Sequence, residues 1–289
     1  VKRTPKAEYQ KRTTDSTESQ FDMIKKLELD EHQHEELIAY CKKKPIEFMS
    51  SPFDLPSVAL LAKLNLDRIK VPSGEITNIP YLEAVAKLGK PVIMSTGMSY
   101  LHEVKFAIET LFKTGLKREQ LSLLHCTSDY PAPMNDVNLR VLDTLHKEFL
   151  LPVGYSDHTL GSEVAIAAVA LGATVIEKHI TIDKSLTGPD HAASMEPQEF
   201  KNMLMQIRNI EIALGGFDKQ PSEREVATRE VVRKRVVAKE KIRKGEVFTE
   251  FNLTTKRAPD GYGAENWHQI IGRQAASDYD LDDSVYYES

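Results

Sequence analysis

One pattern of apolar and polar positions repeats along the chain between residues 46 and 184. Each unit is a short apolar run, then a cluster of Ser, Gly, Asp or His, then a stretch with helical periodicity. Residues 82–88 carry apolar side chains at i, i+3 and i+4, and residues 162–171 are almost wholly apolar. Each stretch stops at a glycine, so both predict helices, the second one buried against a sheet. The apolar runs predict six strands, at residues 46–49, 68–71, 91–94, 121–124, 151–154 and 174–177.

Strands that alternate with helices predict an α/β domain with a parallel sheet. A doubly wound sheet gathers its ligands near one switch point, whereas a closed barrel takes site residues from the end of nearly every strand. Reactive side chains follow all six predicted strands, which favours a (β/α)₈ TIM barrel. Six strands do not close such a barrel and the chain begins abruptly at Val1, so we expect the first two βα units to be absent from it.

The pattern changes near residue 215. Gly215-Gly216 ends the last long helical stretch, and a charged segment follows it. Short β-like runs at 236–238 and 247–248 come next, separated by turn sequences. We therefore predict a barrel domain at 1–217, a linker at 218–232 and a small β-rich domain at 233–289.

Composition and charge exclude several classes of protein. The net charge is −5, which gives no basic field for binding nucleic acid. The longest apolar runs fall well short of the roughly 20 residues that a membrane-spanning helix requires. Cys41 and Cys126 are too few for a disulfide scaffold and fit a reducing cytoplasm, where we expect the protein to reside.

Two histidines end neighbouring predicted strands. His158 and His179 would place two imidazoles side by side, which is half of a site for a divalent transition metal. Asp157 and Glu177 are candidates for supporting these ligands. The alternative is that both histidines only form hydrogen bonds at the mouth of the barrel.

Lysine and hydroxyl side chains at the other strand ends indicate an anion site. Lys70 lies within a predicted strand that Ser73 and Gly74 follow, and Ser95 and Ser156 end two further strands. An ammonium with Ser hydroxyls and exposed backbone N–H groups suits a phosphate or carboxylate. Each Ser-Gly or Thr-Gly pair taken alone is ordinary turn chemistry, but several at one rim indicate a phosphorylated or carboxylated substrate.

Asp190, in the loop after the last strand, could bind sugar hydroxyls or move a proton, or could simply belong to a turn beside Pro189. Dinucleotide and Walker motifs, a nucleophile elbow and paired Cys-x-x-Cys are missing from the sequence.

Six motifs in order along the chain resemble the sialic acid synthase family, which makes N-acetylneuraminic and legionaminic acids. They are IKVPSGEITN (69–78), GKPVIMSTGM (89–98), LHCT (124–127), GYSDHT (154–159), EKHIT (177–181) and GPDH (188–191). The C-terminal residues resemble the antifreeze-like (SAF) domain of the same family.

The resemblance implies a TIM barrel with a SAF domain that reaches over the partner's barrel in a domain-swapped homodimer. It implies an enzyme that condenses phosphoenolpyruvate with an N-acetylated hexosamine, either N-acetylmannosamine or 2,4-diacetamido-2,4,6-trideoxymannose. The products implied by the resemblance are a nonulosonic acid and phosphate. The implied metal cofactor is Mn²⁺, or alternatively Mg²⁺ or Co²⁺.

Residue roles follow from the matching motif positions. The metal ligands would be His158 and His179, which with Asp190 form the catalytic group. Asp190 would also face the sugar, with Glu75 and with Arg257 from the other subunit. Phosphoenolpyruvate would be bound by Lys70, Ser73, Ser95, Ser128, Tyr130 and Ser156.

Two other hypotheses about the function stay open. One is a pseudaminic acid or spore-coat polysaccharide synthase, and the other is a barrel that binds sugar without catalysis. The family's Glu on the first barrel strand and Lys on the second are not recognised here, so we expect this chain by itself to be inactive or poorly folded.

Overall fold

The computed structural model describes residues 5–7, 10–11, 14–15 and 17–286. The chain divides into two compact units, residues 1–215 and 216–289. The outermost ends of the predicted domains, 1–4 and 287–289, lie outside the described residues. Within the part described, no helix combines the length and the apolar character needed to cross a membrane.

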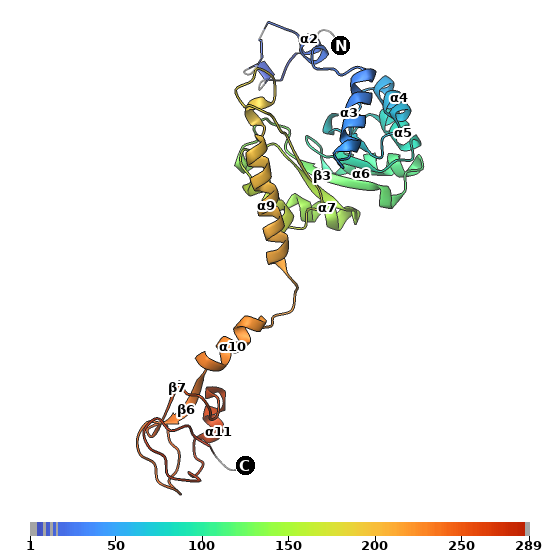
Figure 1. Ribbon diagram of the computed structural model, residues 1–289. Coiled ribbons are helices and arrows are strands. Elements are labelled where there is room, and N and C mark those ends of the chain that lie inside the picture. Colours follow the sequence, from blue (N-terminus) through green and yellow to red (C-terminus); the bar gives the residue numbers. More distant parts are fainter. Residues whose placement is uncertain (1–4, 8–9, 12–13, 16, 287–289) are drawn as a thin grey trace. The chain divides into compact units, whose positions relative to one another are not determined.

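A parallel sheet of five strands forms the centre of the first unit (Figure 1). The strands pair in chain order, β1-β2-β3-β4-β5, and every pairing is parallel. This confirms an α/β fold with a parallel, curved sheet. The strands are β1 (Ile69–Val71), β2 (Val92–Ser95), β3 (Leu121–Cys126), β4 (Val153–Asp157) and β5 (Ile176–Lys178).

The strand expected at 46–49 is wrong. These residues form no strand, although the Lys70 amide donates to the Ser50 carbonyl beside them at 3.4 Å. A strand requires a ladder of such bonds, and one long bond at the edge of β1 does not provide it. The apolar pattern of this segment is real, but the pairing that would make it a strand is not formed.

Helices alternate with the strands, as the periodicity predicts. The predicted helix at 82–88 lies within α5, whose N-terminal amide at Tyr81 is capped by Asn78, and Gly89 follows it with φ of 65°. The helices of this unit are α2 (Gln20–Lys25), α3 (Glu31–Lys43), α4 (Leu55–Leu64), α5 (Ile79–Lys87), α6 (Leu101–Lys113), α7 (Val141–Phe149), α8 (Glu163–Ala170) and α9 (Pro197–Leu214).

The two faces of the sheet have different roles because successive side chains point to opposite sides. The outer face is apolar and packs against α5, α6, α7 and α8. It consists of Ile69, Val71, Val92, Met94, Leu121, Leu123, Val153 and Tyr155. The inner face carries polar side chains, chiefly toward the carboxyl ends of the strands, which positions the candidate site.

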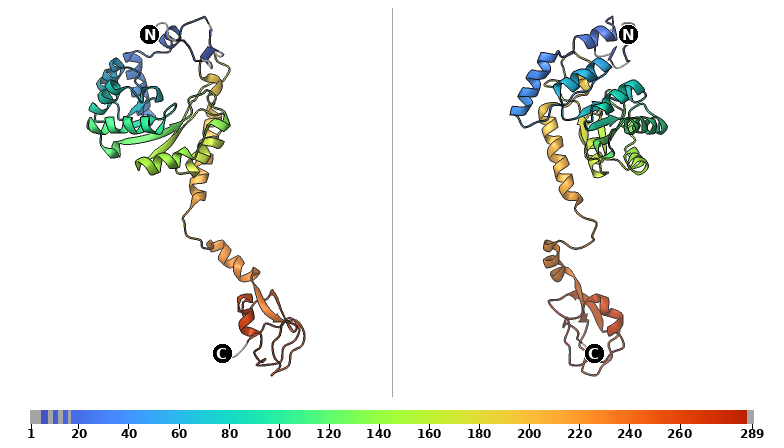
Figure 2. Two further views of the ribbon diagram at one scale, coloured as in Figure 1. Left: turned by 180° about the vertical axis from the view of Figure 1, so that it is seen from behind. Right: turned by 90° about the vertical axis from the view of Figure 1, so that its right-hand side faces the viewer.

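The predicted apolar helix at 162–171 corresponds to α8. Its buried residues face both β4 and α9, and Ala165 and Val169 pack against Met203 and Ile207. The ribbon of α9 runs alongside the rest of the first unit (Figure 2). The last helix of the first unit, α9, ends at Gly215 as predicted, and Gly215 has a backbone φ of 55°.

The second unit has its own small core. Strands β6 (Lys234–Ala238) and β7 (Leu253–Arg257) pair antiparallel, and α11 (Trp267–Ile270) follows them. The β-like run at 247–248 forms only an isolated bridge, between Val247 and Gln274. The segment predicted as a linker is largely a helix, α10 (Glu223–Val232), because Ser222 and Glu225 form a reciprocal capping box at its start.

Candidate functional site

The predicted phosphate-binding residues meet at the carboxyl ends of β1, β2, β4 and β5. Lys70 is buried, and its Nζ lies 2.8 Å from Ser95 Oγ and 3.4 Å from Glu177 Oε2. Ser156 Oγ donates to Glu177 Oε1 at 2.6 Å. One ammonium, one carboxylate and two hydroxyls thus form a network across the inner face, so the structure brings these predicted residues together.

Ser73 and Ser128 meet at the glycine that follows β2. The Gly97 amide donates to Ser73 Oγ at 3.0 Å. A Cβ at Gly97 would lie 2.3 Å from Ser128 Oγ and 2.9 Å from Ser73 Oγ, far inside normal contact. Only glycine therefore lets the two hydroxyls approach here, which leaves a small cradle of donors beside the Lys70 network.

The two predicted metal ligands are neighbours. The ring centroids of His158 and His179 are 5.3 Å apart, and Tyr130 lies against both, at 4.1 Å and 5.4 Å. His158 Nδ1 lies 2.7 Å from the Thr127 carbonyl, which can only accept a hydrogen bond. The neutral ring is therefore protonated on Nδ1 and keeps a lone pair on Nε2.

Burial favours the neutral form of His158. Desolvation lowers the pKa of this imidazole, and the neighbouring His179 adds to the effect, while the Thr127 carbonyl opposes it. A neutral imidazole is the form that coordinates a metal ion.

Asp190 lies beside His179. The shortest distance between them is 3.8 Å, from Asp190 Oδ2 to His179 Nδ1. Asp190 Oδ1 is buried and has no hydrogen-bond partner among the residues that the structure describes. Such an atom is an acceptor available to a ligand, because an unpaired buried polar atom is costly.

These residues fit a divalent cation, with two imidazoles and a neighbouring carboxylate. The fit is incomplete, because among the described residues, this group included, no three or more His, Cys, Asp or Glu side chains are arranged to hold a metal ion by themselves. Water and substrate would have to complete the coordination of an ion held by His158 and His179.

The sequence predicts that Asp157 supports the metal ligands, and in the structure its carboxylate bonds to Lys178 and Thr159 and not to an imidazole. It lies on the outer face and pairs with Lys178 at 2.8 Å. Glu177 is on the inner face, and its oxygens face Lys70 and Ser156 rather than an imidazole. The two-residue alternation along β4 and β5 accounts for both placements.

One residue of the cluster was missed. Cys126 ends β3, and its Sγ lies 3.7 Å from His158 Nδ1 and 3.9 Å from Ser128 Oγ. Burial raises the pKa of this thiol, so it is a neutral group between the hydroxyl cradle and the imidazoles. The signal was present in the strand alternation, which places Cys126 on the same face as Leu124.

Glu75 and Arg257 are the two remaining residues predicted to face the sugar. Glu75, in the 3₁₀ turn Ser73–Glu75, accepts a hydrogen bond from Asn78 at 2.6 Å. Arg257 ends β7 in the second unit, and its side chain is exposed. The roles expected for both stay predictions.

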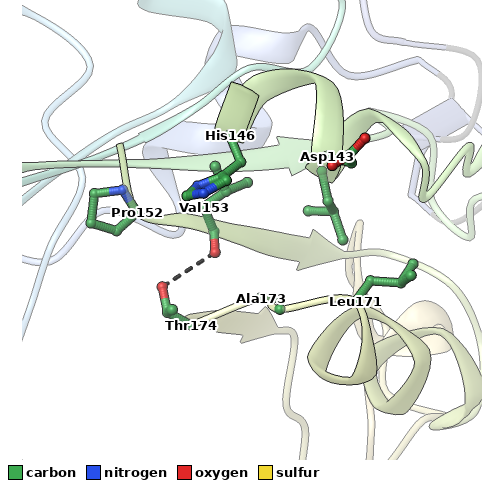
Figure 3. A pocket seen from close by; sticks show the side chains of 9 residues that line it. Asp143, His146, Pro152, Val153, Leu171, Ala173 and Thr174 are labelled. Atoms are coloured by element: carbon green, nitrogen blue, oxygen red, sulfur yellow. Dashed lines mark hydrogen bonds between the residues drawn. The ribbon is translucent and has the colours of Figure 1, made fainter. Parts of the chain in front are cut away.

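The pocket in Figure 3 lies at the opposite end of the strands. It has a volume of about 300 Å³ and contains His146, with Pro152 and Thr174 just before β4 and β5. Thr174 is hydrogen-bonded to the Val153 carbonyl there. None of the predicted site residues lines this pocket, and ligands of parallel α/β sheets bind at the carboxyl ends of the strands.

Comparisons with known proteins give the same assignment as the motifs. Residues 1–219 match the NeuB family and residues 233–279 match the SAF domain. The chain is 51% identical over 280 residues to the N,N'-diacetyllegionaminic acid synthase of Campylobacter jejuni, covering 97% of this chain and 84% of that protein. It is 39% identical over 264 residues to human N-acetylneuraminate-9-phosphate synthase, covering 91% of this chain and 73% of that protein.

A solved structure is also similar. The N-acetylneuraminic acid (sialic acid) synthetase of Leptospira borgpetersenii, in complex with citrate, is 33% identical with a TM-score of 0.68. The match covers 76% of this chain and 77% of that one. The expected resemblance is thereby confirmed, and the chain belongs to the NeuB family, with a SAF domain in its second unit.

Proposed function

We propose that this protein condenses phosphoenolpyruvate with an N-acetylated hexosamine, releasing phosphate and forming a nonulosonic acid of the sialic or legionaminic type. The observation that carries the proposal is the adjacency of two sites at one edge of the sheet. The Lys70 network and the Ser73–Gly97–Ser128 cradle suit an anion, and the His158–His179 pair beside them suits a divalent ion. The names of the similar proteins support the same reaction.

The basic and hydroxyl side chains would bind phosphoenolpyruvate, and the acidic side chain would bind the sugar. Lys70 and the Ser hydroxyls would hold the phosphate and carboxylate of phosphoenolpyruvate and offset their negative charge. C3 of phosphoenolpyruvate then attacks the sugar aldehyde, water adds at C2, and phosphate leaves the tetrahedral intermediate. A bound divalent ion would supply Lewis-acid polarisation of the aldehyde oxygen. Asp190, with its free Oδ1, would bind a sugar hydroxyl.

Between the two sugars, the 2,4-diacetamido sugar is our choice because the relative at 51% identity is named for diacetyllegionaminic acid. The test is phosphate release by the full-length protein with phosphoenolpyruvate and Mn²⁺, offering each sugar separately with an EDTA control. Metal-dependent release with the 2,4-diacetamido sugar is expected, and His179→Ala should abolish it. Release that EDTA leaves unchanged would refute the metal-dependent reaction.

We also propose that the five-stranded sheet is part of a closed (β/α)₈ barrel. The inner face borders a hollow of about 280 Å³, which Ile93, Leu124 and Glu177 line from the sheet and α9 lines from beside it. Barrel interiors are filled by such side chains, so further strands packed here would complete the core. A version of the protein extended by the βα units that closure requires should unfold at a higher temperature than residues 1–289 alone, and equal melting temperatures would count against closure.

The domain-swapped homodimer is a further part of the proposal, in which Arg257 of one chain serves the site of the other. Mixing tests it. Co-refolded His179→Ala and Arg257→Ala chains should regain activity that neither has alone, because the mixed dimer contains one intact site. Activity that stays at the level of the separate variants would refute the exchange.

A further inference from the structure

A buried ion pair joins the residues that immediately precede the two histidines on β4 and β5. Asp157 Oδ2 accepts from Lys178 Nζ at 2.8 Å, and the side chains are 0% and 1% exposed respectively. The two residues are directly opposite each other in the parallel register of β4 and β5. Each immediately precedes one of the candidate metal ligands, His158 and His179.

The pair also fixes the turn that carries His158. Asp157 Oδ1 accepts from both the amide and the hydroxyl of Thr159, at 2.9 Å and 2.8 Å. Lys178 Nζ donates to the Thr159 carbonyl at 2.5 Å. An ammonium on β5 therefore contacts the chain both before and after His158, and the turn has little room for another conformation.

Other bonds complete the positioning. The His158 carbonyl accepts from the Ala132 amide at 2.9 Å, and the His179 carbonyl accepts from the Met195 amide at 2.9 Å. The backbone of each histidine is thus bonded on one side to a neighbouring loop. Two polar side-chain contacts join the ends of β4 and β5: Asp157–Lys178 on the outer face and Ser156–Glu177 on the inner face.

A contribution to folding stability alone does not explain why this ion pair is buried. Removing two charges from water is expensive, and a buried ion pair contributes little more stability than well-packed apolar residues of the same volume. What it adds is a fixed geometry, because both charges are satisfied in one arrangement of the two strands only.

We propose that Asp157 and Lys178 are positioning residues, which set the separation and orientation of the His158 and His179 imidazoles. This rests on the proposed function where it concerns a metal ion. Groups behind metal ligands commonly change metal affinity by about 10- to 100-fold when they are replaced.

The test measures Mn²⁺ affinity of the full-length protein from the free-ion signal in electron paramagnetic resonance. Asp157→Asn and Lys178→Met should each weaken binding about 10- to 100-fold, and the double variant should be no weaker than the worse single one. Lys178→Arg, which retains the charge, should recover part of the affinity. The matched control is Leu145→Ala in the core of α7, which should lower the melting temperature and leave the Mn²⁺ dissociation constant unchanged.

Dissociation constants within about twofold of the wild type in both pair variants would overturn the proposal, whatever their melting temperatures. Should neither variant fold, Thr159→Val removes one bond to Asp157 and keeps the ion pair. A several-fold weaker affinity in that variant supports the proposal, and wild-type affinity overturns it.

A second measurement requires no metal. In the metal-free wild type, nuclear magnetic resonance of labelled histidine should show His158 protonated on Nδ1. In Asp157→Asn this resonance should shift or double, and an unchanged spectrum would overturn the positioning role. Absence of Mn²⁺ binding by the wild type would count against the proposed function alone, and the histidine spectrum would then decide this inference.

Discussion

Replacing Gly97 by Ala tests whether the Ser73–Gly97–Ser128 cradle binds phosphoenolpyruvate. The added Cβ would lie 2.3 Å from Ser128 Oγ and 2.9 Å from Ser73 Oγ. Both hydroxyls are ends of short side chains, so they must rotate away, and the bond from the Gly97 amide to Ser73 is lost with them. Because Gly97 has no left-handed φ, this steric conflict is the main effect of the change.

The magnitude follows from the displaced hydrogen bonds. A hydrogen bond to a charged group contributes about 1.5–3 kcal/mol. Loss of one such bond to the substrate phosphate would raise the KM for phosphoenolpyruvate about 10- to 150-fold, at 1.4 kcal/mol for each factor of ten. We expect kcat to change less, because the hydroxyls hold the phosphate before and during the reaction.

The assay is initial-rate phosphate release across a range of phosphoenolpyruvate concentrations. Gly74→Ala is the matched control: it lies one residue after Ser73, and its Cβ would meet no atom within 4 Å. Ser128→Ala added to Gly97→Ala should restore thermal stability by removing the closest contact, and should leave KM high. Equal KM values for Gly97→Ala and Gly74→Ala would refute the assignment of the cradle.

Three other outcomes are expected. Lys70→Met should lower kcat/KM for phosphoenolpyruvate about 30- to 150-fold in the same assay. The substitution removes about 2–3 kcal/mol of charged hydrogen bonding and leaves Glu177 without the ammonium beside it. A loss below threefold would contradict this prediction. Burial lowers the pKa of His125 from 6.5, so the unfolded chain binds more protons below that pH and the wild type should lose stability on acidification. In denaturant titrations between pH 7.5 and 5.5, His125→Gln should flatten this loss, and equal slopes would contradict the reasoning. Phe248→Ala should cost about 3–5 kcal/mol in the second unit, so calorimetry should show its transition shifting alone; a joint shift of both units would contradict separate cores.

Five of the six predicted strands are confirmed, because a buried parallel strand appears in the sequence as a short apolar run. The segment at 46–49 shows why the sixth failed: its apolar pattern is local, whereas a strand depends on a partner that supplies a ladder. The start of α10 was readable in principle, since Ser222 and Glu225 have capping-box spacing. The high density of charge in that segment indicated a linker instead.

The candidate site was predicted as a set of residues but not as a network. Motif positions identified Lys70, Ser95 and Ser156, yet the link through Glu177 depends on which face of β5 meets β1 and β2 across the sheet. Strand alternation places Cys126 on the inner face, but its contacts with His158 and Ser128 are what make it part of the site. Long-range adjacency of this kind is a property of the curved sheet, which local periodicity does not contain.

The strict alternation along β4 and β5 has a consequence for how this sequence can change in length. A single inserted or deleted residue within Val153–Asp157 would exchange the two faces beyond it, sending the imidazole outward and a carboxylate into the phosphate network. The same insertion between α7 and β4, or between α8 and β5, would only lengthen a connection. A library of one-residue insertions should therefore show intolerance confined to these few strand positions, with tolerated sites beginning abruptly at the loops before them.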